Sequence, residues 1–295
     1  MKEFFKYLSV GEEDKNWGLY LNVAGKAEIA PNKIYPSPDH PSGYFFQWQN
    51  GRVLQEFQLI YVTEGGGVLE DESGKYQIKA GTIMILRPGI SHRYRPEKKS
   101  GWIESYIGFE GELAHRFLAK KTFADASIIN CGIRGELIDT YDKIFNLVKE
   151  EEPGFQAIAS GLIIKLLGYL ISFEKRKDFS GKPIEKVIQK ARFQMREQFD
   201  QKMDLRQFAE ANHVGYAYLR KMFKKYTGLP PHQYHLELKI MKARELIFTT
   251  EKSIKEICFE LGFDSLHYFS RLFKKKTGVN PSELRKNASQ KIKTE

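Results

Sequence analysis

The sequence MFKKYTG at Met222–Gly228 returns fifty residues later as LFKKKTG at Leu272–Gly278. Pro231 likewise returns at the same offset as Pro281. Each copy closes a segment whose apolar spacing predicts two short helices joined by a turn. A basic helical unit that occurs twice in one domain is typical of a protein that reads two stretches of one DNA duplex.

The first unit carries helix signals at its ends. Asp204 is placed to cap the first helix, and Asn212-His213 to form the turn that follows it. The second helix is expected over residues 216–226. Gly228 is placed to end that helix in a left-handed conformation.

The second unit repeats this plan. Ser253 and Glu256 have the spacing of a capping box, and Gly262-Phe263 is the expected turn before a helix over residues 265–276. Residues 233–248, between the units, are predicted to form one amphipathic helix about 24 Å long. Such a rod suits two reading helices held about one DNA turn, roughly 34 Å, apart.

The exposed face of the second helix in each unit supplies the candidate DNA contacts. Arg220 and Arg271 are the expected base readers, because a guanidinium matches the guanine edge with two hydrogen bonds. Lysines on these faces suit phosphate oxygens, although a single basic residue on a helix is more often simply solvated. The predicted DNA-binding residues are Tyr216, Tyr218, Arg220, Lys221, Lys224, Ser265, His267, Tyr268, Ser270, Arg271, Lys274 and Lys275.

The charge of the chain is concentrated in the same region. Residues 1–183 hold 24 Lys or Arg and 24 Asp or Glu, so they have no net charge. Residues 184–295 hold the remaining 23 and 13, which is the whole formal charge of +10. A solvated basic surface is the alternative, but this segregation favours a polyanionic partner bound by the C-terminal part.

Cysteine usage and the apolar segments bear on the compartment. Cys131 and Cys258 lie in apolar stretches expected to be helical, without a CxxC neighbour, which excludes a disulfide framework or a cysteine zinc site and fits the cytoplasm. Residues 1–14 lack the apolar core of a signal peptide. Residues 155–173 are long enough to span a membrane, but Lys165 interrupts them, so a buried or dimer-forming helix is expected and no membrane.

The N-terminal part is expected to be β. Strand runs such as residues 57–62, 82–86 and 102–109 alternate with turn signals, and Gly65-Gly66-Gly67 is expected to turn the chain. Short strands at this spacing suggest a barrel or a sandwich. Residues 113–175 are expected to be helical, and the polar residues that follow them to be a linker.

Residues 184–287 resemble the DNA-binding domain of the AraC/XylS family of transcription regulators. The resemblance is carried by the repeated FKKxTG phrase, by ICFELGFDSLHYFSRLF at Ile257–Phe273 and by NPSELR at Asn280–Arg285. It implies a sequence-specific DNA-binding regulator, an activator that touches RNA polymerase. Cys258 stands where the family usually has Ala, and Gly215 where it usually has the Ser that caps the first recognition helix.

The N-terminal region resembles the cupin-like effector domain that the same family carries, on residues 81–94 and 102–109. The implied fold class is multidomain β + α. The predicted domains are a cupin-like effector-binding β-barrel with an N-terminal arm at 1–112, a helical dimerisation segment at 113–175, a linker at 176–183 and an all-α double helix-turn-helix domain at 184–290.

The resemblance also implies an effector cavity in the barrel. In family members that bind arabinose, the sugar lies against the His-x-Tyr segment and the strand after Trp102. Glu104 and Tyr106 stand where the arabinose binders have His and Trp, which favours another sugar or an oligosaccharide. The candidate effector residues are His92, Tyr94, Glu104, Tyr106, Arg52, Trp48 and Tyr61, with packing in the core as the alternative role for each.

Neither a metal nor another cofactor is expected, and the chain is not expected to be an enzyme. Metal-dependent cupins need a His-x-His pair, a Glu and a further His, whereas His92 has no His two residues away and the seven histidines do not gather. The expected partners are double-stranded DNA, a small carbohydrate effector, RNA polymerase and a second copy of the chain. A cupin-type enzyme fused to a DNA-binding domain and an effector-independent DNA binder are the rival hypotheses.

Overall fold

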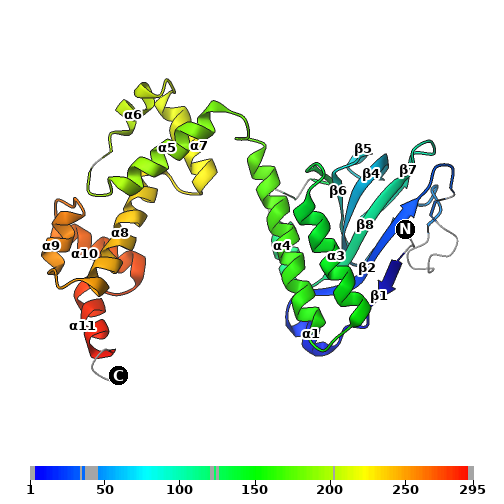
Figure 1. Ribbon diagram of the computed structural model, residues 1–295, viewed down its shortest axis with the longest axis horizontal. Coiled ribbons are helices and arrows are strands. Elements are labelled where there is room, and N and C mark those ends of the chain that lie inside the picture. The colour runs from blue at the N-terminus through cyan, green and yellow to red at the C-terminus, as the bar shows by residue number, and fades with distance from the viewer. Residues whose placement is uncertain are drawn as a thin grey trace. The chain divides into compact units, whose positions relative to one another are not determined.

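The computed structural model describes residues 4–33, 35–36, 46–119, 123, 126–201 and 203–291, the last four of these by their backbone alone (Figure 1). The chain divides into two compact units, Met1–Arg176 and Lys177–Glu295. The first unit is built on a β-sheet and the second is helical. The predicted fold class, a β domain followed by an all-α domain, is confirmed.

The first unit contains one antiparallel sheet, with nine strands among its described residues. Its main path runs β1-β2-β8-β4-β6-β9, while β5 and β7 pair with the far end of β4, and β3 pairs with β7. The strands are β1 Phe4–Tyr7, β2 Tyr20–Ile29, β3 Arg52–Val53, β4 Phe57–Asp71, β5 Gly74–Lys79, β6 Thr82–Leu86, β7 Ser91–Pro96, β8 Trp102–Glu110 and β9 Ile128–Asn130.

Strand β4 spans both halves of this sheet. The turn predicted at residues 65–67 is therefore wrong, since the strand continues through the three glycines with a bulge between Val62 and Glu64. A Cβ on Gly65 or Gly67 would lie less than 3.0 Å from backbone atoms of neighbouring segments. Glycine allows those segments to close in where β4 passes from one half of the sheet to the other.

The sheet buries apolar side chains on both faces. Leu59 and Tyr61 of β4 belong to the cluster shared with the helices, whereas Ile60 and Val62 belong to a second cluster on the inner face. This follows from the alternation of side chains along a strand. The inner face also holds most of the polar candidate residues, so it positions the ligand site described below.

Helices cover the outer face of the sheet (Figure 1). They are α2 Glu112–Leu118, α3 Gly135–Glu150 and α4 Phe155–Arg176, while the short helix α1 is Glu12–Asn16. The side-chain amide of Gln156 on α4 accepts from the backbone N–H of Leu21 at 3.0 Å and donates to its carbonyl oxygen at 2.9 Å. By length and composition α4 could cross a membrane, but Ile163, Leu166 and Leu170 are buried in the core shared with the sheet.

Two expectations about the segment after β8 are wrong. Ile128–Asn130 was expected to be helical but forms β9, which pairs with β6. Its two adjacent isoleucines are β-branched and suit a pleated, half-buried edge. Cys131, also expected in a helix, follows this strand and is buried, with its Sγ 3.2 Å from the carbonyl oxygen of Gly81.

The second unit contains the two predicted helix-turn-helix pairs. They are α6–α7 and α9–α10, with α8 between them. The helices are α5 Pro183–Glu197, α6 Leu205–Ala211, α7 Tyr216–Thr227, α8 Pro231–Thr249, α9 Ile254–Glu260, α10 Leu266–Thr277 and α11 Pro281–Lys291.

Just before α5, Phe179 is buried edge-on to Tyr226, with ring centroids 5.0 Å apart, and Asp178 forms an ion pair with Lys225. These residues of the expected linker thus pack within the second unit.

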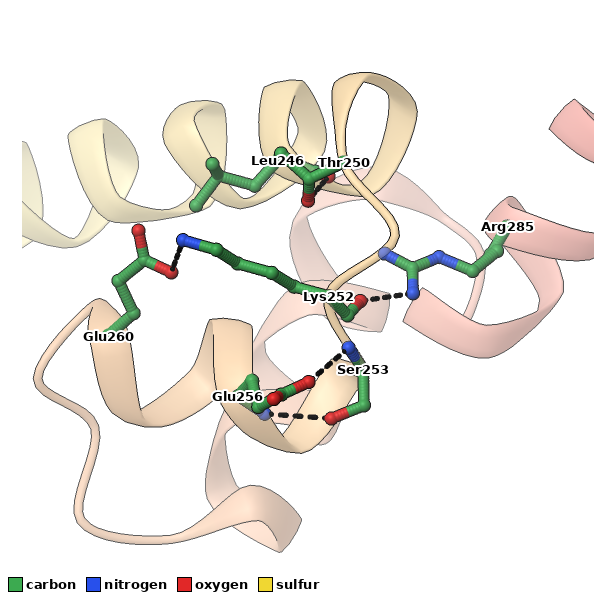
Figure 2. Close-up of polar contacts among 7 residues, drawn as sticks. All are labelled: Leu246, Thr250, Lys252, Ser253, Glu256, Glu260 and Arg285. Atoms are coloured by element: carbon green, nitrogen blue, oxygen red, sulfur yellow. Dashed lines mark hydrogen bonds and ion pairs between the residues drawn. The ribbon is translucent and has the colours of Figure 1, made fainter.

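Side-chain caps define the starts of the short helices. Figure 2 shows the capping box, in which the Ser253 Oγ accepts from the N–H of Glu256 and the Glu256 carboxylate accepts from the N–H of Ser253. Asp204 accepts from two backbone amides of α6. Ser265 caps α10, whereas Gly215 offers α7 no side-chain cap, as its departure from the family pattern implies.

The repeated Thr-Gly dipeptide ends α7 and α10. Gly228 and Gly278 are both left-handed, with φ of 84° and 85°. The Thr227 hydroxyl lies 2.8 Å from the carbonyl oxygen of Phe223, and Thr277 repeats this contact at 2.9 Å with Phe273. The most conspicuous residues of the repeat therefore terminate helices or pack in the core.

Candidate DNA-binding surface and ligand cavity

Helices α7 and α10 present the predicted DNA contacts to solvent. Ten of the twelve residues are exposed, while Tyr216 and Ser270 are half-buried. The opposite faces are fixed in the two cores by Leu219 and Phe223 in α7 and by Phe269 and Phe273 in α10. Core packing thus fixes which side chains of each helix can reach a partner.

The predicted cationic DNA contacts differ from neighbouring lysines of α7 and α10 in whether they form ion pairs. Lys225 forms an ion pair with Asp178, and Lys276 forms one with Glu237 of α8. Within the described residues, the six cations among the predicted contacts form no ion pair. They are Arg220, Lys221, Lys224, Arg271, Lys274 and Lys275. Uncompensated positive charge on both reading helices suits the phosphates of DNA.

Tyr216 serves as a platform for two arginines. The guanidinium carbons of Arg206 and Arg220 lie 5.1 and 5.5 Å from the centroid of its ring. Arg206 lies in the first turn of α6 and was not among the sequence candidates. Its position could have been found from the sequence, because an Arg at the second position of α6 falls outside the apolar face of that helix. This helix contributed only its cap and its core residues to the prediction from sequence.

A cavity lies on the inner face of the sheet in the first unit. It is narrow, because the centre of a water-sized sphere can move through only about 20 Å³ of it. Four predicted effector residues line it: Arg52, Tyr94, Glu104 and Tyr106. The other lining residues, which the sequence did not predict, are Tyr7, Tyr35, Pro36, Phe46 and Gln58.

Arg52 organises one wall of this cavity. Its Nη2 donates to the Tyr94 hydroxyl at 2.7 Å, and its Nε lies 3.2 Å from the Nε2 of His92. The guanidinium carbon is 5.2 Å from the ring centroids of both Phe46 and Tyr94. Two rings and two hydrogen bonds therefore hold a planar cation at the cavity wall.

Burial keeps the aromatic hydroxyls and the imidazole uncharged. It raises the pKa of Tyr94 and of Tyr35, and it raises the pKa of Tyr7 to about 12. Burial and then the charge of Arg52 lower the pKa of His92 to about 4. Near neutral pH the wall thus offers neutral phenols beside one guanidinium. The carboxyl group of Glu104, 3.4 Å from the Tyr35 hydroxyl, adds an acceptor.

Three sequence candidates do not line the cavity. His92 lies behind Arg52 and stacks on the Tyr94 ring at 6.3 Å. Trp48 packs under two arginines of β7, the nearer at 3.9 Å from its centroid. Tyr61 is fully buried on the opposite face of β4, where its hydroxyl accepts from the N–H of Arg134. The described residues contain no group of three or more metal-binding side chains.

Comparisons with known proteins agree with this architecture. The model of the AraC-like ligand binding domain matches residues 37–167, and a helix-turn-helix domain model matches residues 208–287. The lactose operon transcription activator of Staphylococcus xylosus is 24% identical over 81% of this chain and 87% of its own length. The arabinose operon regulatory protein of Escherichia coli is 25% identical over 81% and 83%.

Among solved structures, the C-terminal domain of AraT, a response regulator from Geobacillus stearothermophilus, is 34% identical. The match covers 34% of this chain and 84% of that domain, with a TM-score of 0.33. The two matched models show that an AraC-like ligand-binding domain and a helix-turn-helix domain occur in one chain, and this protein belongs to the AraC family of DNA-binding transcription regulators.

Proposed function

We propose that a small polyhydroxylated effector, a sugar or oligosaccharide, binds the cavity of the β domain and changes how the regulator engages its promoter. The observation that carries this proposal is the convergence of Arg52, Tyr94, Glu104 and Tyr106 on one cavity. Aromatic rings suit the CH faces of a sugar, and the guanidinium, carboxyl and phenol groups suit its hydroxyls. Two similar proteins are named for the lactose and arabinose operons.

On the DNA side, the proposal assigns Arg220 and Arg271 to bases and the neighbouring lysines to phosphates. The first turns of the two reading helices differ, with YAY at Tyr216–Tyr218 and LHY at Leu266–Tyr268. Two similar scaffolds with unlike exposed faces read two different base sequences. The site of each protomer is accordingly asymmetric.

We further propose that the protein is an activator that contacts RNA polymerase, and that it forms a homodimer through α3 and α4. On α4, Ile158, Gly161, Lys165 and Gly168 follow one another at helical spacing and are all exposed. A Cβ on either glycine would meet nothing within 4 Å, so a second helix has room to approach closely along this stripe. Gly161→Leu should fill that space, and sedimentation equilibrium should then report the 34.2 kDa protomer. Unchanged dimer mass in this variant would point to another interface.

The effector proposal is tested by thermal shift of the full chain across a panel of sugars. A ligand at 100 times its dissociation constant stabilises the protein by about 2.7 kcal/mol. Arg52→Met should abolish the shift because it removes the cation at the cavity wall. Trp48→Phe is the matched control, since Trp48 lies outside the cavity. If no sugar shifts the melting temperature of the wild type, the effector is not a sugar. If Arg52→Met shows the same shift as the wild type, the sugar binds outside this cavity.

A further inference from the structure

The two helix-turn-helix pairs are built around separate cores. Phe208 and Phe223 belong to the first cluster, and Phe269 and Phe273 belong to the second. Helix α8 contributes to both, and a cavity lies between the pairs beside its first turns. Since the described residues form no continuous core across that cavity, the angle between the two pairs depends on α8 and on a few contacts beside it.

One of those contacts comes from the residues that follow α5. Phe199 lies between α5 and α6, just before the first pair in sequence, yet it packs against the core of the second. On α8, the Nε2 of His235 lies 3.2 Å from the carbonyl oxygen of Phe199, and Lys239 donates to the carbonyl oxygen of Gly262 at 3.3 Å. Lys239 is only 6% exposed. We call this group of five residues the latch: Phe199, Asp200, His235, Lys239 and Gly262.

A comparison of the turn residues in the two pairs shows why the latch needs a glycine. His213 and Gly262 are equivalent, because Val214 and Phe263 follow them and make the same backbone bond to the preceding helix, at 3.0 and 3.1 Å. Both turn residues are left-handed, with φ of 54° and 65°. The backbone conformation alone therefore tolerates a side chain at this position.

Gly262 is needed for a second reason. A Cβ on it would lie less than 3.0 Å from the carbonyl oxygen of Asp200, closer than real Cβ atoms approach. In the first pair the exposed His213 occupies the same position with its whole side chain. The glycine of the second pair thus marks the place where the segment that leads into the first pair packs against the second.

We propose that the latch is a positioning device that fixes α10 relative to α7 and so sets the spacing between the two DNA sub-sites that the protein accepts. Gly262 lies three residues before Ser265, the cap of α10, and Asp200 lies four before Asp204, the cap of α6. The latch therefore joins the two pairs just before the starts of α6 and α10. This inference rests on the proposed reading of DNA by both pairs.

The spacing of the sub-sites is a sensitive readout of this role. One added base pair moves the second sub-site by about 3.4 Å and turns it by roughly a tenth of a helical turn. A rigid double unit cannot follow such a change without losing base contacts. Wild type should bind the lengthened site about tenfold more weakly, the size of one mismatched base pair, whereas latch variants should lose less than about threefold.

The experiment uses the full chain and DNA selected by it from a random library, followed by probes with one base pair inserted between the sub-sites. Gly262→Asn adds a Cβ against Asp200 while keeping a residue that tolerates the left-handed region. His213→Asn is the matched control in the first pair. Phe199→Ala opens the latch without touching the turn, whereas Lys239→Met removes the hydrogen bond to the Gly262 carbonyl without adding a Cβ there. Thermal melts confirm that each variant folds.

Wild type and His213→Asn should keep one preferred spacing, while the latch variants should still select both sub-sites but accept several spacings. Folded Phe199→Ala and Lys239→Met proteins that retain the tenfold penalty would overturn the positioning role. An equal loss of affinity at every spacing would also overturn it, since that result indicates only damaged reading helices. If wild type itself selects no sequence, the proposed DNA reading fails first and the latch role fails with it.

Discussion

Lys274→Gln should weaken the salt dependence of DNA binding, and Lys276→Gln should not. The two lysines lie two residues apart on α10, and both are exposed. Lys276 forms an ion pair with Glu237, whereas Lys274 has no ion-pair partner among the described residues. A lysine that binds phosphate releases a counterion from the DNA, and a lysine already held by a carboxylate on its own chain does not.

The magnitude follows from the number of phosphate contacts. Lys221, Lys224, Lys274 and Lys275 are the lysines proposed to bind phosphates, and each contributes about −0.9 to the slope of log K against log salt. Four contacts give a slope of about −3.6 for each protomer, so affinity should fall about 150-fold between 50 and 200 mM salt. Lys274→Gln should reduce the slope to about −2.7 and the fall to about 40-fold.

Fluorescence anisotropy of the full chain on a selected DNA fragment, titrated at several salt concentrations, measures these slopes. Lys276→Gln is the matched control because it removes the same charge from the same helix. Equal slopes for the two variants would refute the assignment of Lys274 to a phosphate. A reduced slope in Lys276→Gln alone would show that its pair with Glu237 opens when DNA binds.

Three further predictions concern stability. The pKa of His92 is about 4 when folded against 6.5 for the free group, so the unfolded chain binds the extra proton as pH falls below 6.5. Stability of the β domain should therefore decline by about 3 kcal/mol between pH 6.5 and 4. Urea titrations of His92→Gln should lack that decline, and an unchanged pH profile would assign it to other groups. Gln156→Leu should cost about 2–3 kcal/mol, because it leaves the buried N–H and carbonyl of Leu21 without their partners; a neutral effect in denaturant would mean that those groups find substitutes. Ser253→Ala should cost about 1 kcal/mol through loss of the capping box, detectable as a lower melting temperature of the second unit, and an identical melt would contradict it.

The helix-turn-helix domain was predictable from sequence because its determinants are local. Asp204, Ser253 and the Thr-Gly stops act within a few residues of where they stand. The glycines of β4 were misjudged for the opposite reason. Gly65 has the composition of a turn, but what decides its role is the approach of Gly101, more than thirty residues away.

Contacts between the two pairs were equally hidden. Phe199 has no local pattern that assigns it to the second core, and Lys239 looks like any solvated lysine of an amphipathic helix. The informative comparison is between the two copies. Where a repeat uses His213 in one copy and Gly262 in the other at one backbone conformation, the difference indicates a close approach by another part of the chain.

The ligand cavity was predicted only in part because β4 is buried on both faces. In such a strand apolar residues no longer alternate with polar ones, and Tyr61 looks as well placed for a ligand as any other aromatic residue. The exceptions to the apolar run are informative. Gln58 of β4 and Glu56, the residue just before that strand, are two residues apart and both buried, and the Gln58 amide donates to the Glu56 carboxylate at 2.8 Å. Polar residues at alternate positions of a buried strand mark the face that holds polar groups, and Tyr61, at an odd separation from Gln58, must then lie on the other.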